Sequence, residues 1–469
     1  MSEFRIERDS LGEVRVPAGA YYAAQTQRAV ENFPISGQPM PPEFIHALGR
    51  VKAAAARVNR GLGLLDEARA VLIERAATEV GAGKLDAHFP IDVFQTGSGT
   101  SSNMNANEVI ARRAMELGGA EAPQIHPNDH VNFGQSSNDI APTALHVAAV
   151  LAIENDLLPA LRALHAALAA KAREFDGVIK TGRTHLMDAV PIRLGQEFSG
   201  YASQIAHGIA RVEVVLPDLR ELAAGGTAVG TGLNTHPEFG RRLAAELSRA
   251  LGVGFVEAGN HFEAQAARDA AVWASGALNT VAASLMKIAN DIRILASGPH
   301  CGLAELKLPA LQPGSSIMPG KVNPVICEAV IQVGAQVAGN HLVVTQGAQW
   351  GQLDLNTMVP LVARNLLESI RLLARAAAVF AEKAVAGLAA DAEVCSGYVE
   401  ISPSMATALN PLIGYDRAAE IAKRAAQERR AVRELAREMT DLSPEEIDRA
   451  LDPRRQTEPG LDLGTPGGG

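Results

Sequence analysis

The densest group of reactive side chains lies in residues 314–324, which read GSSIMPGKVNP. Two hydroxyls (Ser315, Ser316), the cation of Lys321 and the carboxamide of Asn323 fall within nine positions. Glycine and proline disfavour helix and strand interiors, so we expect a loop here. Such a loop is either a plain surface connection between two helices, or a segment that grips a small anion and closes over it. Composition alone leaves both interpretations open.

Three further polar segments lie in the first third of the chain. TGSGT at 96–100 leads into an expected helix, where hydroxyls cap the end and free N–H groups attract anions. It lacks the lysine of a phosphate-binding P-loop, so a nucleotide site is disfavoured and a plain helix cap is the ordinary alternative. HPND at 126–129 and SSND at 136–139 are typical of turns, but their serines and Asn138 also offer donors to an anion.

The remaining polar segment is TGRTH at 181–185. A lone histidine is usually structural, but His185 follows a glycine break, and an imidazole exchanges protons near neutral pH. Glu328 stands just beyond the Gly/Pro-rich loop. If a helix begins near Pro324, Glu328 lies about one turn into that helix, and its carboxylate could point toward the same pocket opening as Lys321. A solvated glutamate on a helix face is the alternative.

Long amphipathic helices are expected to position these segments. Aliphatic residues recur at helical spacing in three stretches, which marks buried helix faces. These residues are Leu157, Leu161, Leu164 and Leu168; Val281, Leu285, Ile288, Ile292 and Leu295; and Val362, Leu366, Ile370 and Leu373. The pattern predicts long helices around 142–173, 190–222 and 262–297, which assemble into a bundle. Alanine on several faces permits close approach of helices and points to oligomerisation through the bundle.

The chain of 469 residues exceeds the size at which one core usually stops growing, roughly 250–300 residues, so more than one domain is expected. We predict a mainly α protein with an N-terminal domain (1–138), a central long-helix bundle (139–391) and a small helical C-terminal domain (392–469). Shorter helices are predicted at 43–60, 66–83, 415–429 and 430–439, and from Ser443 onward through a capping box with Glu446.

Composition narrows the class of protein further. Hydrophobic residues make up 47% and charged residues 20%, which is globular, and the net charge of −9 disfavours nucleic-acid binding. No uncharged apolar stretch approaches ~20 residues, so no membrane span is expected. Three scattered cysteines and the absence of ligand spacing predict no metal site, no disulfide framework and a cytoplasmic location.

Together these segments resemble the fumarase/aspartase superfamily, whose signature loop matches GSSIMPGKVNP. The similarity covers essentially the whole chain, through AAQTQR, QTGSGT, HPND, QSSND, GRTH, GGTAVGTGLN, KIANDIR and NPLIGYDRAAEIAK. Within the superfamily the chain is most similar to class II fumarases. Aspartases typically carry Gln in place of His185 and Ala in place of Gly320. LPALQPG and GQLDLN are closer to aspartases, so aspartate ammonia-lyase is retained as the alternative function.

The resemblance implies a metal-free and cofactor-free fumarate hydratase, a hydro-lyase that interconverts L-malate and fumarate. Ser315 would be the base that takes the C3 proton, while Lys321 and Asn323 would stabilise the resulting aci-carboxylate. His185, coupled to Glu328, would polarise the water that adds or leaves at C2. The residues implied to bind substrate are Ser98, Gly99, Thr100, Ser136, Ser137, Asn138, Thr184, Ser316, Val322 and Asn323.

The resemblance also implies a second dicarboxylate site and an assembly. The second site would consist of His126, Pro127, Asn128 and Asp129, although residues 122–124 read APQ where some relatives carry a basic residue. The assembly would be a homotetramer whose active sites combine segments from three subunits. The partners are then a small dicarboxylate and further copies of the chain, without nucleic acid or membrane.

A third possibility is a non-catalytic member of the superfamily, either structural or a dicarboxylate-binding protein. A purely structural copy would be free to lose the reactive residues of the loop and the GRTH segment. Ser315, Lys321 and His185 are all present, which favours an enzyme.

Overall fold

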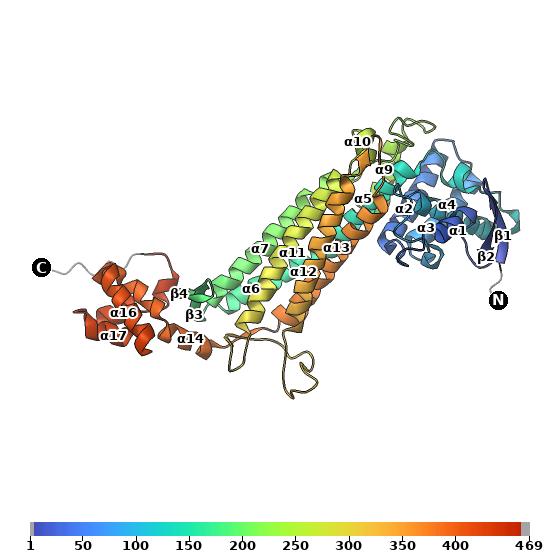
Figure 1. Cartoon of the computed structure of the whole chain (residues 1–469). Helices are drawn as coiled ribbons and strands as arrows, with labels where there is room; N and C mark the ends of the chain where they lie inside the picture. The colour runs from blue at the N-terminus through green and yellow to red at the C-terminus, as the bar shows by residue number, and fades with distance from the viewer. Residues whose placement is uncertain (1–3, 461–469) are drawn as a thin grey trace. The chain divides into compact units, whose positions relative to one another are not determined.

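The computed structural model describes residues 4–460, which divide into two compact units built from interleaved segments. Unit 1 comprises Met1–Pro159, Gly208–Ala282 and Val333–Arg375, and unit 2 comprises Ala160–His207, Ala283–Gln332 and Ala376–Gly469. The long helices pass from one unit into the other (Figure 1). The division into three domains at residues 138 and 391 remains a prediction.

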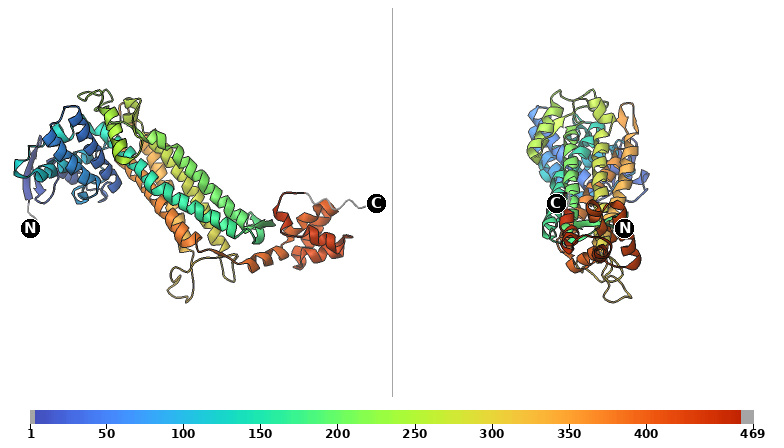
Figure 2. Two further views of the ribbon diagram at one scale, coloured as in Figure 1. Left: turned by 180° about the vertical axis from the view of Figure 1, so that it is seen from behind. Right: turned by 90° about the vertical axis from the view of Figure 1, so that its left-hand side faces the viewer.

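The fold is mainly α, as predicted, and its strands form five two-stranded sheets in the described part. Within each unit, stretches of the long helices run side by side (Figure 2). These helices are α5 (Ser137–Ala152), which continues through a π-helical turn, η4 (Ile153–Leu157), into α6 (Leu158–Glu174), and α7 (Leu194–Val214), α11 (Asp269–Leu295), α12 (Val325–Ala348) and α13 (Val359–Val379).

The predicted apolar stripes form the core of these helices. Every residue of the three stripes is at most 5% exposed. One continuous helical stretch, Ser137–Glu174, is long and apolar enough to cross a membrane, and 61% of its most apolar window is buried inside the protein. The core helix of a soluble protein meets the same criteria.

Two helix boundaries differ from the prediction at 190–222. Helix α7 begins only at Leu194, because Met187–Arg193 forms strand β4, paired antiparallel with β3 (Ile179–Thr184). The helix ends at Val214 and a short α8 (Leu216–Leu219) follows, with Pro217 near its start. Proline lacks the N–H that would continue the preceding helix. The periodic pattern had merged a strand and two helices into one.

The helix predicted at 262–297 is also divided. A short α10 (His261–Ala266) precedes α11, and Ala267 between them is extended, with ψ 162°. Asn260 caps α10 through hydrogen bonds from the N–H groups of Phe262 and Glu263. Apolar spacing alone did not reveal the break, because the break depends on the backbone conformation of one residue, Ala267, and the cap at Asn260 depends on a side-chain hydrogen bond.

Unit 1 also contains the N-terminal helices. It contains in addition a β-hairpin, β1–β2, that was not predicted from the sequence. Its elements are β1 (Phe4–Asp9), β2 (Gly12–Pro17), α1 (Ala24–Asn32), α2 (Pro42–Gly61), α3 (Glu67–Gly81), α4 (Thr100–Gly118) and α9 (Phe239–Leu251). Helices α2 and α3 confirm the predictions at 43–60 and 66–83. They cross closely at Gly49, where an added Cβ would lie 2.4 Å from the amide nitrogen of Gly81.

Unit 2 ends in the small helices α14 (Ala392–Ile401), α16 (Tyr415–Glu428), α17 (Val432–Met439) and α18 (Pro444–Ala450), which share a hydrophobic core. The predicted capping box is confirmed. The Ser443 N–H donates to Glu446 Oε2 at 2.8 Å, and the Glu446 N–H donates to Ser443 Oγ at 3.2 Å.

Candidate active site

In unit 1, the segment TGSGT forms the entrance to α4. Gly99 precedes the first helical residue, Thr100, in a left-handed conformation with φ 79°. The Ser98 and Thr100 hydroxyl oxygens lie 2.7 Å apart. The first N–H groups of a helix have no partners inside the helix, and the helix dipole favours negative charge there. The segment therefore presents hydroxyls and backbone donors suited to a carboxylate.

The SSND segment, residues 136–139, forms the entrance to α5. Ser136 caps the helix by accepting the Asn138 N–H at 3.2 Å, and its own N–H donates to Asp139 Oδ1 at 2.9 Å. Because the hydroxyl oxygen accepts within the cap, its proton remains to be donated to a ligand. The Asn138 amide donates to the Ala228 carbonyl at 2.7 Å, which fixes that side chain.

The structure brings these two segments together. Asn103 of α4 donates to Ser137 Oγ at 2.9 Å, and an added Cβ at Gly99 would lie 2.8 Å from the Ala141 Cβ of α5. The N-terminal ends of α4 and α5 thus lie side by side in unit 1. The binding of one small anion by their hydroxyls stays a prediction.

A buried charge pair supports this end of unit 1. The ammonium of Lys52, inside α2, donates to Asn132 Oδ1 at 2.7 Å and Gln135 Oε1 at 2.9 Å. Burial lowers the pKa of Lys52 to about 7, although the charge of Asp139 opposes this shift. Burial raises the pKa of Asp139 to about 6, opposed by hydrogen bonds from backbone N–H groups.

Sequence reasoning missed these supporting residues. Lys52 stands in the stretch VKAAAARV, and a charged residue inside so apolar a helix was the available signal. Asn103 belongs to the series Asn103, Asn105 and Asn107, all of them buried in α4. Buried polar side chains need hydrogen-bond partners, so such a series indicates an internal polar network.

The HPND segment folds as a turn, in agreement with the turn interpretation. His126 caps the π-helical turn η3 (Pro127–Val131), and its Nδ1 accepts the N–H groups of Asn128 at 3.3 Å and Asp129 at 3.1 Å. The His126 and Asp129 side chains are both exposed. A second anion site at this turn stays a prediction.

In unit 2, the GRTH segment leads into the tip of a β-hairpin. Strands β3 and β4 pair with Thr184 opposite Met187, so His185 and Leu186 form a two-residue turn. Both have positive φ, 56° and 62°. Such turns usually contain glycine or asparagine, and bulky residues there store strain of the kind found at functional sites. The hairpin presents the exposed His185 at its tip.

The GSSIMPGKVNP segment is a loop in unit 2, as predicted, with a closed neck. The Gly314 N–H donates to the Lys321 carbonyl at 2.7 Å, and the Asn323 amide donates to the Gly314 carbonyl at 2.6 Å. An added Cβ at Gly314 would lie 2.5 Å from the Lys321 carbonyl oxygen, so the neck requires glycine. The tip is open, and Ile317 is 84% exposed.

Two backbone donors surround the Ser315 hydroxyl. Its Oγ accepts the N–H of Ile317 at 3.2 Å and the N–H of Met318 at 3.0 Å. Hydrogen bonds to the charged form of a group favour that form. A serine is an ordinary alcohol with a high pKa, and two such donors would stabilise an alkoxide if Ser315 lost its proton.

Glu328 lies in the first turn of α12, as predicted, with its N–H bonded to the Pro324 carbonyl at 3.1 Å. Its side chain is exposed. Among residues 4–460, no hydrogen bond or ion pair joins Glu328 to His185, and none joins the hairpin tip to the 314–324 loop. Within the described residues, the histidine is therefore not bonded to its implied carboxylate partner or to the loop.

The described residues contain no cluster of three or more His, Cys, Asp or Glu side chains that could hold a metal ion. Burial raises the pKa of the Cys327 and Cys395 thiols to about 12, and the exposed Cys301 is also unpaired with another cysteine. The prediction that the site uses no metal or cofactor stays a prediction.

Comparison with known proteins places the chain among lyases. The Lyase family model matches residues 12–339, and the Fumarase C C-terminus model matches residues 405–458. The class II fumarate hydratase of Corynebacterium efficiens is 57% identical, with 96% of each chain covered. That of Halobacterium salinarum is 59% identical over 98% of this chain and 99% of its own. The class II fumarase structure from Schistosoma mansoni has a TM-score of 0.94 and 41% identity, covering 97% of this chain and 99% of its own.

Proposed function

The chain belongs to the family of class II fumarate hydratases, which are hydro-lyases acting on a dicarboxylate, and from this premise we propose how its own residues interconvert fumarate and L-malate. The observation that carries the proposal is the pair of backbone donors on Ser315 Oγ. They provide the activation that a serine needs in order to act as a base.

In the direction of dehydration, the Ser315 alkoxide takes the proton from C3 of malate. The electron pair left behind moves into the neighbouring carboxylate, which becomes an aci-carboxylate with an additional negative charge. Lys321 and Asn323, at the neck of the same loop, donate to that developing charge. Ser316 and Val322 line the loop beside them and contact the substrate.

His185 serves the other half of the reaction. Hydroxide leaves C2 as the aci-carboxylate collapses to fumarate, and a proton from the imidazole converts the hydroxide to water. Glu328 holds the imidazole in the orientation that this transfer needs. Hydration of fumarate follows the same steps in reverse, with His185 taking a proton from the water.

The paired helix ends of unit 1 bind the substrate carboxylates. Their groups are Ser98, Gly99, Thr100, Ser136, Ser137 and Asn138, joined by Thr184 of the hairpin. Charge-assisted hydrogen bonds to the carboxylates orient the substrate between base and acid, and orientation supplies a large part of the barrier reduction.

We propose further that the site is completed by other copies of the chain in a homotetramer, and that the protein works in the cytoplasm. Among residues 4–460 no hydrogen bond or ion pair joins His185 to Glu328, so in this proposal a partner copy supplies the carboxylate that faces each imidazole. The turn at His126, Pro127, Asn128 and Asp129 is proposed as a secondary anion site.

A substrate panel tests the proposed reaction. Purified protein is given L-malate, fumarate, L-aspartate and argininosuccinate in separate assays, and absorbance in the fumarate band is followed together with ammonia release. We expect fumarate to form from malate without ammonia. Ammonia release from L-aspartate with no reaction of malate would instead assign the aspartate ammonia-lyase function.

A further inference from the structure

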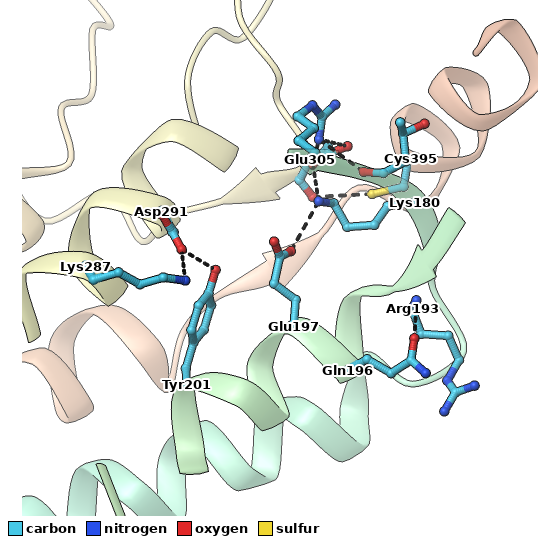
Figure 3. A network of polar contacts seen from close by, with 11 residues as sticks. Lys180, Arg193, Gln196, Glu197, Tyr201, Lys287, Asp291, Glu305 and Cys395 are labelled. Carbon is cyan, nitrogen blue, oxygen red and sulfur yellow. Dashed lines mark hydrogen bonds and ion pairs between the residues drawn. The ribbon is translucent and has the colours of Figure 1, made fainter. Parts of the chain in front are cut away.

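A buried carboxylate lies directly behind the hairpin that carries His185. Glu305 is fully buried, and both of its oxygens accept from Arg183 Nη1 at 2.9 Å. The ammonium of Lys180, only 1% exposed, lies 3.2 Å from the same carboxylate (Figure 3). One buried anion thus holds two cations of strand β3.

A β-bulge lies in the β3–β4 pair between the two cations. Residues three apart in a regular strand point to opposite faces, so Lys180 and Arg183 would not meet the same partner. The register of β3 against β4 shifts between Thr181 and Arg183. Gly182 lies at the shift, and an added Cβ there would be 2.7 Å from the Val190 carbonyl. The extra residue lies on β4, where Ala189 and Val190 stand opposite Gly182 alone, and such a bulge increases the local twist of the strand pair beside Arg183.

Glu305 is itself fixed from two directions. Its N–H donates to the Leu295 carbonyl at the end of α11, and its carbonyl accepts the Asp391 N–H, both at 2.9 Å. The next residues form strand β7 (Leu306–Lys307), which pairs with β10 (Ala389–Ala390). The carboxylate is therefore a rigid reference point inside unit 2.

A second anion completes the charge balance. Glu197 of α7 lies 3.2 Å from the Lys180 ammonium, so two cations and two anions alternate in the cluster. Figure 3 shows the same face of α7 continuing to Tyr201, whose hydroxyl donates to Asp291 Oδ2 at 3.1 Å. Removing one member of a buried charge cluster leaves its partner uncompensated, so such a cluster is held as a unit.

We propose that Glu305 is a positioning residue for the reaction: through Arg183 it fixes the β3–β4 hairpin and so sets where His185 stands. The inference rests on the proposed role of His185. Arg183 is two residues before His185, and the tip turn contains no glycine to absorb a displacement. A misplacement of about 1 Å in a reacting group can reduce the rate ~100-fold.

The test is a double-mutant cycle between Glu305→Gln and His185→Asn, with kcat and KM measured for malate on the intact assembly. We expect Glu305→Gln to lower kcat about 100-fold, with KM changed less than about 3-fold. Because Glu305 acts through the imidazole, the double variant should be no slower than His185→Asn alone. Losses that multiply in the double variant would show that Glu305 acts independently of His185, and would overturn the proposal.

A charge-balanced variant separates positioning from stability. Glu305→Gln leaves an excess buried cation, and adding Lys180→Met removes that excess while Arg183 still lacks its carboxylate. We expect the double variant Glu305→Gln/Lys180→Met to melt at a higher temperature than Glu305→Gln alone, with kcat still low. Recovery of both melting temperature and kcat would mean that charge balance alone matters, and the proposal would fail.

Two further measurements complete the design. Lys171→Met removes another nearly buried lysine of unit 2, whose bonds go to Glu174 and the Leu388 carbonyl, and it should lower stability without lowering kcat. If His185→Asn keeps full activity, the proposed role of His185 is wrong, whatever Glu305 does. If His185→Asn is slow and Glu305→Gln is fully active, only the positioning inference is wrong.

Discussion

The two halves of the proposed site are built in opposite ways. In unit 1, the binding hydroxyls stand at helix ends and are held by neighbours: Ser98 is 7% exposed and Ser137 is 8% exposed. In unit 2, the reactive groups stand on projecting tips. Leu186 beside the histidine is 76% exposed, and Ile317 on the loop is 84% exposed. Among the described residues, hydrogen bonds join α4 to the entrance of α5 in the first half, whereas none joins His185 to Glu328 or to the 314–324 loop in the second.

This difference separates binding from chemistry. A carboxylate is recognised by several modest hydrogen bonds, which are effective when the donors are fixed in advance. Proton transfer to and from carbon is favoured when bulk water is excluded and only the reacting water remains, yet the substrate must first enter. Exposed tips that are covered on assembly or loop closure meet both needs. Variants in the two halves should therefore fail in different kinetic parameters.

The largest effect is expected at the hairpin tip. His185→Asn removes the proton donor and acceptor and keeps a polar side chain, so kcat should fall about 1,000-fold with little change in KM. Steady-state kinetics with malate and fumarate measure both parameters. His165→Asn, in α6 of the same unit, is the matched control and should retain normal kcat. Normal kcat in His185→Asn would remove the distinction between the two halves.

A smaller loss is expected at the loop neck. Lys321→Met removes one positive charge facing the aci-carboxylate while keeping most of the side-chain volume, and kcat/KM should fall about 100-fold. Lys423→Met, at an exposed position of α16, changes the net charge equally and serves as control. Equal kinetics for the two variants would show that the loop cation acts only through overall charge.

The binding half should respond through KM. Ser136→Ala removes one hydrogen bond to a charged ligand, so KM should rise about 10-fold while kcat changes little. It also removes a helix cap, at a cost of about 1 kcal/mol. Ser443→Ala is a closely matched control, because Ser443 forms the same capping box in α18 without a proposed ligand. Ser443→Ala should lower the melting temperature and leave KM and kcat unchanged. A drop in kcat for Ser136→Ala would contradict the assignment of binding to unit 1 and chemistry to unit 2.

The sequence predicted the parts of this molecule that depend on local periodicity or on the chemistry of a few neighbouring residues. The leucine stripe from Leu157 to Leu168 and the capping box of Ser443 are of this kind, and both are confirmed. The hairpin was missed because its turn places His185 and Leu186, rather than glycine or asparagine, at positive φ. Hairpin turns at positive φ usually contain glycine or asparagine, so the residue types of this turn gave no signal of a hairpin.

The supporting residues of the site were missed for a related reason. Lys52 in a helix is indistinguishable by spacing from a solvated lysine, and its partners Asn132 and Gln135 are 80 or more positions away. The meeting of Asn103 with Ser137 is likewise set by how α4 and α5 pack. The reactive residues could be named from the sequence because their motif resembles a family; the placement of each side chain required the fold.

The smallest effect concerns Lys52, the buried lysine behind the binding residues of unit 1. The experiment tests whether the charge of Lys52 affects the free energy of unfolding. Burial lowers the pKa of Lys52 from 10.5 to about 7, so between these values the unfolded chain binds more protons than the folded one. Stability from this group must therefore rise with pH across that window, with a slope of at most about 1.4 kcal/mol per pH unit. Lys52→Met removes the slope and leaves the Asn132 and Gln135 oxygens without this donor.

The melting temperatures of wild type and Lys52→Met should consequently diverge as pH rises from 7 toward 10, with the variant lower throughout. Asp139 does not reverse this sign above pH 7. Its pKa is raised from 3.8 to about 6, so the stability it contributes is already lost as pH climbs between those two values. Two melting curves that stay parallel from pH 7 to 10 would mean that Lys52 keeps its proton in the folded protein. The binding half would then hold a permanent buried cation, and its hydroxyls would face the substrate with one more positive charge behind them.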